Sequence, residues 1–342
     1  MSLIAAAIRA AEEIFLPDRI TKAGISFLVE RTRRRLARMD ANQNTSFARA
    51  MEDYPIAQYV ETANRQHYEL PPAFFDLTLG PHRKYSSCLY PTGRETLEAA
   101  ELLALEATSD HADLANGQRI LELGCGWGSL TLYMAAKFRD STIVAVSNSV
   151  AQRRHIEAEA QRRSLDNIVV ITADMNTFAP NSTFDRIVSV EMFEHMSNWR
   201  DLLQRTRSWL ASDGCLFLHV FSHRSQPYRF DHKNDADWIA RHFFTGGIMP
   251  SHGLVGEFID LFNVEESWRW SGVHYQNTAL HWLEKFDANV KDIIPIFLDV
   301  YGRDAKLWLR RWRLFYLATA CLFGCEDGNE WGVSHYRLRP IT

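Results

Sequence analysis

The sequence contains no long hydrophobic run. No stretch of about 18 consecutive apolar residues occurs among its 342 residues, so we predict no membrane-spanning helix. The N-terminal stretch lacks the charged-then-apolar pattern and cleavage site of a secretory signal, and we therefore expect a cytoplasmic protein. Low-complexity segments and internal repeats are also missing, which argues against a disordered chain and a repeat array.

Cysteine and net charge are low as well. The five cysteines are scattered and have no zinc-site spacing, so we expect reduced thiols and no metal site. A formal net charge of −4 gives no basic field of the kind that binds nucleic acid. The length suits one large α/β core with a helical addition. Nothing in the sequence predicts an oligomeric state.

A glycine-rich turn is the most informative feature that is present. Gly124 and Gly126 follow a short apolar run at residues 119–123 and let the backbone turn tightly and approach a ligand. A dinucleotide site would need glycine at position 129, which is Ser129, and an acid about 20 residues further on. The acid instead precedes the glycines, at Glu122. This order resembles the first motif of the class I S-adenosylmethionine (SAM) methyltransferases.

From about residue 119, strand patterns alternate with helical ones. Strands are predicted at 119–123, 142–147, 167–172, 186–191 and 215–221, and helices around 127–138, 149–163 and 198–211. Such alternation predicts a Rossmann-like, doubly wound α/β sheet with ligands at the carboxyl ends of its strands. A strand near 333–338 completes a mostly parallel sheet with an antiparallel last strand, and a further strand is predicted near 264–270, within the helical lid that precedes it.

Helices dominate the rest of the chain. We expect an N-terminal helical segment over residues 1–80 that forms part of a cap. A SAM-binding domain follows over 81–342, with a helical lid inserted at about 223–325. One predicted N-terminal helix, at 20–39, carries five arginines. Such a basic face either lies on an anionic membrane surface or, more commonly, is simply solvated.

Several segments around the glycine turn together resemble a known family. They are Tyr68-Glu-Leu-Pro71, Lys84-Tyr-Ser86, Leu123-Gly-Cys-Gly-Trp-Gly-Ser-Leu-Thr131, Glu191-Met-Phe-Glu-His-Met196 and Phe243-Phe-Thr-Gly-Gly-Ile-Met-Pro-Ser251. The set resembles the cyclopropane fatty acid synthase superfamily of SAM-dependent enzymes and, within it, the coclaurine-type N-methyltransferases. The resemblance extends from about residue 55 to the end. It implies SAM as methyl donor and a small aromatic amine as acceptor.

The glycine turn is expected to hold the methionyl and ribose side of SAM at Gly124 and Gly126. By resemblance, Tyr85 and Ser86 hydrogen-bond the SAM carboxylate. The structural alternative for Tyr85 is an ordinary half-buried tyrosine.

The tips of the next two strands are expected to bind the adenosine. Many class I enzymes place an acid after the second strand, whereas this chain has a polar tip that includes Asn148. The superfamily often uses a glutamine on the following helix instead, and Gln152 fits that place. Asp174 and Met175, after the third strand, suit the exocyclic amine and the face of adenine. Asp174 could also be only a turn residue.

The segment after the fourth strand concentrates titratable groups near the expected methyl position. Only a neutral amine has the lone pair for methyl transfer, so the site must accept a proton. We assign Glu194 as general base and His195 as its hydrogen-bonding partner, with Glu191 and Glu69 binding the ammonium form. The alternative is that Glu194 and His195 are a helix cap and a core histidine.

Aromatic residues of the lid are candidates for the acceptor pocket. Trp312, Phe315 and Tyr316 lie at helical spacing, and the resemblance places Trp312 and Phe315 against the substrate ring. Aromatic faces suit both a planar acceptor and a cation. The same stripe could equally be plain core.

The chief rival function is cyclopropane synthesis on unsaturated phospholipid chains, which would involve peripheral membrane contact. There the resemblance implies a bicarbonate ion held by a cysteine, a glutamate, a histidine and a tyrosine. The matching positions are Ser87, Glu194, His219 and Tyr275, so the cysteine is missing. Glu191 also stands where these synthases usually carry glycine, which favours an amine acceptor. A non-catalytic SAM-binding protein is a minor alternative.

Overall fold

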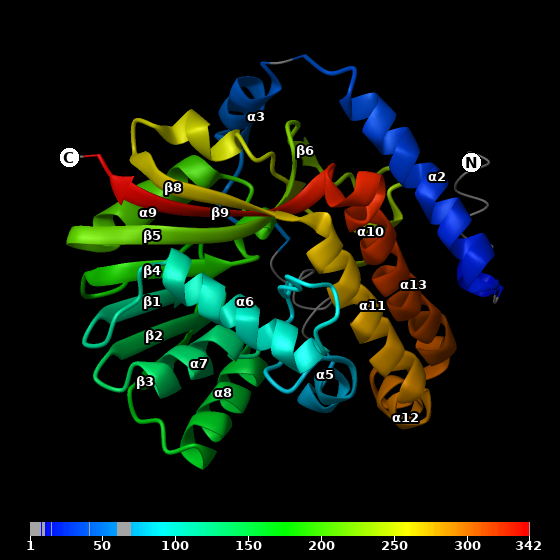
Figure 1. Cartoon of the computed structure of the whole chain (residues 1–342), viewed down its shortest axis with the longest axis horizontal. Coiled ribbons are helices and arrows are strands. Elements are labelled where there is room, and N and C mark those ends of the chain that lie inside the picture. The colour runs from blue at the N-terminus through cyan, green and yellow to red at the C-terminus, as the bar shows by residue number, and fades with distance from the viewer. Residues whose placement is uncertain (1–7, 9–10, 15, 41, 60–69, 342) are drawn as a thin grey trace.

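The computed structural model describes residues 8, 11–14, 16–40, 42–59 and 70–341. In these ranges a central sheet carries helices on both faces, and more helices lie beyond one end of its strands (Figure 1). The main helices are α2 (Asp18–Leu36), α3 (Gln43–Met51), α5 (Pro72–Thr78), α6 (Leu97–His111), α7 (Ser129–Lys137), α8 (Val150–Arg162), α9 (Trp199–Trp209), α10 (Trp238–His242), α11 (Gly272–Ala288), α12 (Val290–Tyr301) and α13 (Ala305–Phe323). Short 3-10 turns are η1 (Phe193–His195), η2 (Leu254–Phe258), η3 (Gly302–Asp304) and η4 (Cys325–Gly328).

Seven strands form the sheet in the order β3-β2-β1-β4-β5-β9-β8. They are β1 (Arg119–Leu123), β2 (Thr142–Ser147), β3 (Ile168–Thr172), β4 (Phe184–Val190), β5 (Leu210–His223), β8 (Phe262–Ser271) and β9 (Trp331–Pro340), while β6 (Tyr228–Arg229) and β7 (Ile248–Met249) pair separately. β1 to β5 pair in parallel, and β9 runs antiparallel to both β5 and β8. The strand order reverses between β1 and β4, which places the ligand-binding switch point at the carboxyl ends of these strands.

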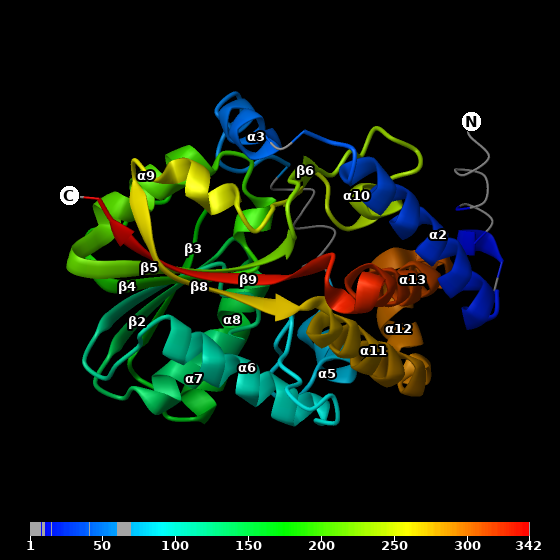
Figure 2. The ribbon, with the colours of Figure 1, turned by 45° about the horizontal axis from the view of Figure 1, so that its top comes forward.

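The two faces of the sheet bury different side chains, because successive strand residues point to opposite sides. Ile120 packs in a cluster with residues of α6, α7 and α8, whereas Leu121 and Leu123 pack in a second cluster with residues of α3 and α9. Figure 2 shows α6 and α7 on one side of the sheet and α3 and α9 on the other.

The helical layer beyond the sheet consists of α11, α12 and α13, with α2 packed on α13 (Figure 1). Its core is aromatic and includes Trp282, Phe297 and Trp312. Arg313 of α13 forms ion pairs with Asp18 of α2 at 2.7 Å and with Asp287 of α11 at 2.8 Å, which ties the N-terminal helix to the lid. None of the helices in the described ranges combines the length and the apolar character needed to cross a bilayer.

The structure confirms the predicted strands within about two residues, except at the start of β5. That strand begins at Leu210 rather than 215, because Leu210 pairs with Phe184 before an irregularity in the register. β8 falls inside the predicted lid range of 223–325, yet it pairs with β9 in the main sheet. The long helices of the insertion, α11 to α13, therefore lie after β8, and the short α10 lies before it. α3 contacts α9 and η2, and the division of the chain into a cap segment and a SAM-binding domain stays a prediction.

Candidate active site

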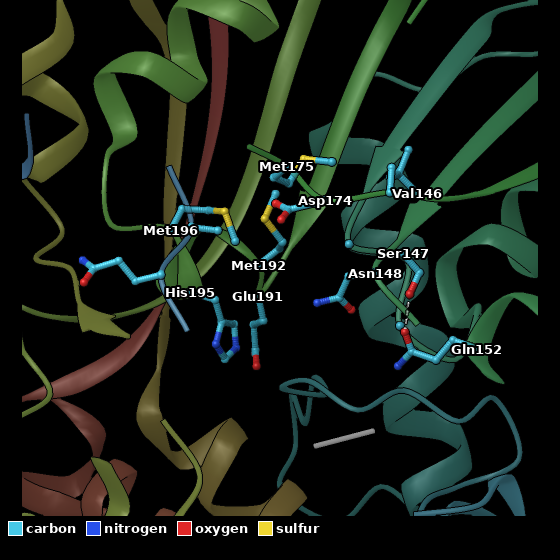
Figure 3. A pocket seen from close by; sticks show the side chains of 15 residues that line it. Val146, Ser147, Asn148, Gln152, Asp174, Met175, Glu191, Met192, His195 and Met196 are labelled. Atoms are coloured by element: carbon cyan, nitrogen blue, oxygen red, sulfur yellow. Dashed lines mark hydrogen bonds between the residues drawn. The ribbon is translucent and has the colours of Figure 1, made fainter. Parts of the chain in front are cut away.

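A cavity with about 740 Å³ of empty space, part of it open solvent, lies at the carboxyl ends of β1 to β4. Figure 3 shows Glu191 and His195 on one side of it and Ser147, Asn148 and Gln152 on the other. Its lining consists of Ala57, Gln58, Gly124, Gly126, Val146, Ser147, Asn148, Gln152, Ala173, Asp174, Met175, Glu191, Met192, His195 and Met196.

The glycine turn forms the floor between β1 and α7. Gly124 and Gly126 have φ values of +80° and +51°, which glycine adopts without steric cost. A Cβ on Gly124 would lie 2.6 Å from Met192, whereas a Cβ on Gly126 would meet no protein atom within 4 Å. Gly126 thus faces open space on the wall of the cavity, where a ligand can approach the backbone.

The tip of β2 and the first turn of α8 form a polar wall. The Ser147 hydroxyl donates to Gln152 Oε1 at 2.6 Å, which orients the amide. Gln152 Nε2 is buried and has no hydrogen-bond partner. A buried donor without a partner is costly unless a ligand accepts from it. The geometry therefore fits the predicted contact of Gln152 with a ribose hydroxyl of SAM.

Beyond β3, Asp174 and Met175 line the same cavity. Asp174 Oδ1 also accepts from the backbone N–H of Asn176 at 2.8 Å, so the residue shapes a turn as well. Asn176 in turn bonds both backbone groups of Ala57, which fixes this N-terminal segment at the cavity.

The loop before α6 lies behind Glu191. The buried Lys84 ammonium donates to Ser86 Oγ at 2.6 Å and to the Ser87 carbonyl at 2.5 Å, and burial lowers the pKa of Lys84. The Tyr85 ring packs against Trp282 of the lid. Neither Tyr85 nor Ser86 lines the cavity, so their contact with the SAM carboxylate remains a prediction.

Glu191 follows β4 with a left-handed backbone, φ +48°, which is uncommon for a residue with a side chain. Its carboxylate accepts from the Ser87 N–H at 2.9 Å, the Tyr275 hydroxyl at 2.7 Å and His219 Nε2 at 3.2 Å. Burial raises the pKa of Glu191, against the opposing effect of the Lys84 charge. The side chains of His219 and Tyr275, which are far apart in the sequence, therefore both bond the carboxylate of Glu191.

Glu194 is fully buried in the turn after Glu191. Its Oε1 accepts from the Phe221 N–H at 2.6 Å, whereas Oε2 is buried without a hydrogen-bond partner. Burial, followed by the nearby charge of Glu191, raises the pKa of Glu194 well above its ordinary value. Such a carboxyl is a strong base when ionised. His195, next along the chain, lines the cavity and stacks on Phe244 with ring centroids 5.2 Å apart.

A family model described as mycolic acid cyclopropane synthetase matches residues 57–325. The chain belongs to this family. It is 37% identical over 298 residues to (S)-coclaurine N-methyltransferase of Thalictrum flavum subsp. glaucum, covering 86% of this chain and 82% of that protein. It is 29% identical over 271 residues to cyclopropane-fatty-acyl-phospholipid synthase of Escherichia coli K12, covering 79% of this chain and 66% of that protein.

Solved structures of the family agree with these matches. A crystal structure of coclaurine N-methyltransferase bound to N-methylheliamine and SAH has a TM-score of 0.95 and 32% identity, and the match covers 99% of this chain and 100% of that one. The predicted class I fold, the use of SAM and the predicted enzyme class, a SAM-dependent N-methyltransferase, are confirmed.

The aromatic lid residues of this methyltransferase lie in its core. Trp312 and Tyr316 are fully buried and Phe315 nearly so, and Phe315 stacks on Phe243 at 4.4 Å. None of the three lines the cavity described above, so their contact with an acceptor ring stays a prediction. Glu69 lies outside the described residues.

Sequence reasoning missed part of the cavity wall of this family member. Ala57 and Gln58 belong to the N-terminal segment, far in sequence from the glycine turn, and no periodic pattern marks them. Lys84 enters the prediction only as part of the Lys-Tyr-Ser motif, although its buried ammonium holds the loop that carries Ser87. Its sequence neighbours, among them Arg83, are polar, so no local signal marks Lys84 as buried.

Proposed function

We propose that this methyltransferase transfers a methyl group from SAM to the nitrogen of a small, alkaloid-like amine that bears an aromatic ring. The observation that supports it best is the carboxylate of Glu191, which accepts from a backbone N–H, a tyrosine and a histidine beside the cavity. SAM supplies the methyl group on a positively charged sulfur atom. The residues of the chain must then bind the amine, orient it and accept its proton.

The surroundings of Glu191 distinguish an amine from an alkene acceptor. The resemblance to cyclopropane synthases implies a bicarbonate held at Ser87, Glu194, His219 and Tyr275. In this chain, Ser87, His219 and Tyr275 instead donate to the side chain of Glu191. A carboxylate of the protein itself thus occupies the donors that would otherwise hold a free anion. A fixed negative charge beside the cavity favours a cationic ammonium over an uncharged double bond.

Proton removal is assigned to the pair of carboxylates and His195. An alkyl amine has a pKa of about 10.4, so roughly one molecule in a thousand is neutral at pH 7. Glu194, whose pKa burial raises, has one carboxylate oxygen without a partner and can accept a proton. We assign Glu194 as the base, His195 as its partner at the cavity wall, and Glu191 as the group that binds the ammonium. Holding the amine near the methyl donor adds a positioning effect worth several kcal/mol.

Substrate size follows from the relatives. The solved coclaurine N-methyltransferase binds N-methylheliamine, and we infer an acceptor of similar size and ring character for this chain. We also propose a cytoplasmic location, because none of the five cysteines forms a disulfide.

The test supplies the purified protein with methyl-labelled SAM and two acceptors in parallel, heliamine and vesicles of unsaturated phospholipid. We expect label in N-methylheliamine and none in the acyl chains. Label in the acyl chains without amine product would instead establish the lipid-modifying function and refute the proposal. A Glu191→Gln variant, which retains the size of the side chain and loses its charge, should raise the KM for heliamine and leave SAM affinity unchanged.

A further inference from the structure

A row of histidines leads away from the active-site carboxylate. His219 Nε2 lies 3.2 Å from Glu191 Oε1, and His219 Nδ1 lies 2.9 Å from His335 Nε2. His335 Nδ1 lies 2.8 Å from His111 Nδ1. His219 and His335 are fully buried, whereas His111 is half-buried. Its Nε2 has no hydrogen-bond partner among the described residues. The row therefore connects the buried carboxylate with the surface.

The sheet register produces this row. His219 of β5 is the direct pairing partner of His335 of β9, and His335 is in turn paired with Trp268 of β8. Residues paired in this way point to the same face of a sheet. The helix α6 ends on that face at His111, whose ring stacks on Trp268 with centroids 3.9 Å apart and an angle of 3°. Trp268 thus holds the last ring of the row in place.

The three rings are held neutral by their surroundings. Burial lowers the pKa of His219, His335 and His111, and the Lys84 charge acts in the same direction on the first two. Around His111, Asp110 and Glu266 raise its pKa and Arg337 lowers it. Glu194, Tyr275 and Lys84 are the other titratable groups near the inner end.

Neutral imidazole has one N–H donor and one acceptor nitrogen, so a chain of such rings can pass protons. All three bonds fit a single direction. His111 donates to His335, His335 donates to His219, and His219 donates to Glu191.

We propose that His219, His335 and His111 form a proton relay that carries the proton of the acceptor amine from Glu191 to solvent. The inference rests on the proposed N-methylation. An ammonium that enters the site loses one proton to the base Glu194, which passes it to the neighbouring carboxylate of Glu191. The neutral amine then forms the new N–CH₃ bond with its lone pair while the methyl–sulfur bond breaks. One proton per turnover remains in the site. The histidine row is a hydrogen-bonded route that leads from Glu191 away from the cavity.

Transfer along the row conserves protons and charge. Before transfer, each ring carries its proton on the nitrogen farther from Glu191: Nδ1 of His219, Nδ1 of His335 and Nε2 of His111. A protonated Glu191 then donates to His219 Nε2, His219 Nδ1–H donates to His335 Nε2, His335 Nδ1–H donates to His111 Nδ1, and His111 Nε2–H releases a proton to water. Transfer leaves the row in the direction given above, and each ring must return to its first tautomer before the next turnover. None of the three rings lines the cavity, so we assign them a role that acts through Glu191.

The test compares steady-state and single-turnover methylation of heliamine by the full chain and by a His335→Gln variant. Glutamine can form hydrogen bonds in this place but cannot pass a proton. We expect the steady-state kcat to fall on the order of tenfold or more, whereas the rate of the first turnover, which needs no proton exit, changes less than about twofold. The solvent deuterium isotope effect on kcat should increase. A His111→Ala variant should lose kcat similarly and regain it when imidazole is added.

The control is His252→Gln. This half-buried histidine bonds Ser334 and Tyr336, which lie on the other face of β9 from His335, and its exchange should leave both rates unchanged. A wild-type kcat in both relay variants would overturn the proposal. So would an equal loss in the single turnover, which would indicate damage to the chemistry itself. If His335→Gln does not fold, as judged by thermal unfolding, the result with His111→Ala and imidazole decides. If the wild-type chain methylates no amine, the proposed N-methylation itself is wrong. If the wild type is active and the relay variants behave as the wild type does, the relay alone is wrong.

Discussion

At the scale of single residues, Glu191 shows how the site combines unfavourable features. Its backbone has φ +48°, and its charged side chain is only 9% exposed. Each feature alone costs free energy, on the order of 1–3 kcal/mol for the backbone. The backbone N–H of Glu191 donates to the His219 carbonyl at 2.8 Å, and three donors surround its side chain. These contacts offset the cost and hold the carboxylate at the cavity, where we propose that the ammonium binds.

The role of Glu194 leads to a prediction. Glu194→Gln removes the proton acceptor and retains the shape, so we expect turnover to fall at least about tenfold with SAM affinity unchanged. Because the pKa of Glu194 is raised, the wild-type carboxyl is protonated and inactive at pH values where an ordinary glutamate is ionised. Wild-type kcat should therefore decrease as the pH falls through that raised pKa. Measurements of kcat against pH at saturating heliamine, with SAM binding by calorimetry, check both points.

The same substitution at another buried glutamate provides the control for this variant. Glu330 is also buried and bonds His223 at 3.2 Å, outside the candidate site. Glu330→Gln should retain wild-type turnover. If Glu194→Gln turned over heliamine as fast as the wild type, the assignment of Glu194 as base would be wrong.

At the scale of elements, the strand β1, the glycine turn and the helix α7 form the unit that we expect to bind the cofactor. The Thr131 hydroxyl of α7 donates to the carboxyl of Glu122 at the end of β1, which links the two elements across the turn. Gly126 lies between them with φ +51° and faces the cavity. The unit is therefore held from behind by a buried hydrogen bond, while its front stays open to a ligand.

Gly126→Val is expected to abolish SAM binding. Its side chain would extend into the open space that a Cβ at this position faces, and SAM must approach the backbone there. Valine at this left-handed φ also strains the backbone, and the experiment must distinguish this strain from a direct clash between the side chain and SAM. Gly117→Val is the control, because Gly117 also has a positive φ, +87°, and open space around its Cβ, but lies before β1. Calorimetry should detect SAM binding by the Gly117 variant only, and wild-type affinity in Gly126→Val would contradict the prediction.

These elements also show what the sequence can and cannot predict. Short apolar runs such as 119–123 and 142–147 gave strand bounds that match the structure, because buried parallel strands have a local signature. The contacts of Glu191 have none. His219 lies 28 residues away and Tyr275 lies 84 residues away, so only the family resemblance suggested that they belong to one site. The packing of Trp312 and Phe315 in the core depends on tertiary contacts that helical spacing alone does not specify.

At the scale of the whole molecule, buried ionisable groups link stability to pH. Burial raises the pKa of Glu122 from 4.5 to about 7. The folded state therefore binds this proton more tightly than the unfolded state, and the stability that results is present below pH 4.5 and lost as the pH rises toward 7. Glu122→Gln keeps a neutral side chain that can still accept from Thr131.

We expect Glu122→Gln and the wild type to have the same free energy of unfolding near pH 4.5. By pH 8 the variant should be more stable by about 3 kcal/mol. Urea unfolding across this pH range measures the difference. The same exchange at the exposed Glu106 is the control, and a constant difference between wild type and Glu122→Gln at all pH values would refute the prediction.

The position of β9 inside the sheet has a consequence for biogenesis. β5 and β9 are adjacent strands, yet His219 and its partner His335 are separated by 116 residues of sequence. A ribosome must synthesise the entire lid before β9 emerges, and until then the long, apolar edge of β5 has no partner. Unpaired edges of this kind are sites of aggregation. We therefore expect the nascent chain to depend on chaperones during this interval, and substitutions that slow the folding of the lid to reduce the yield of enzyme before they affect its chemistry.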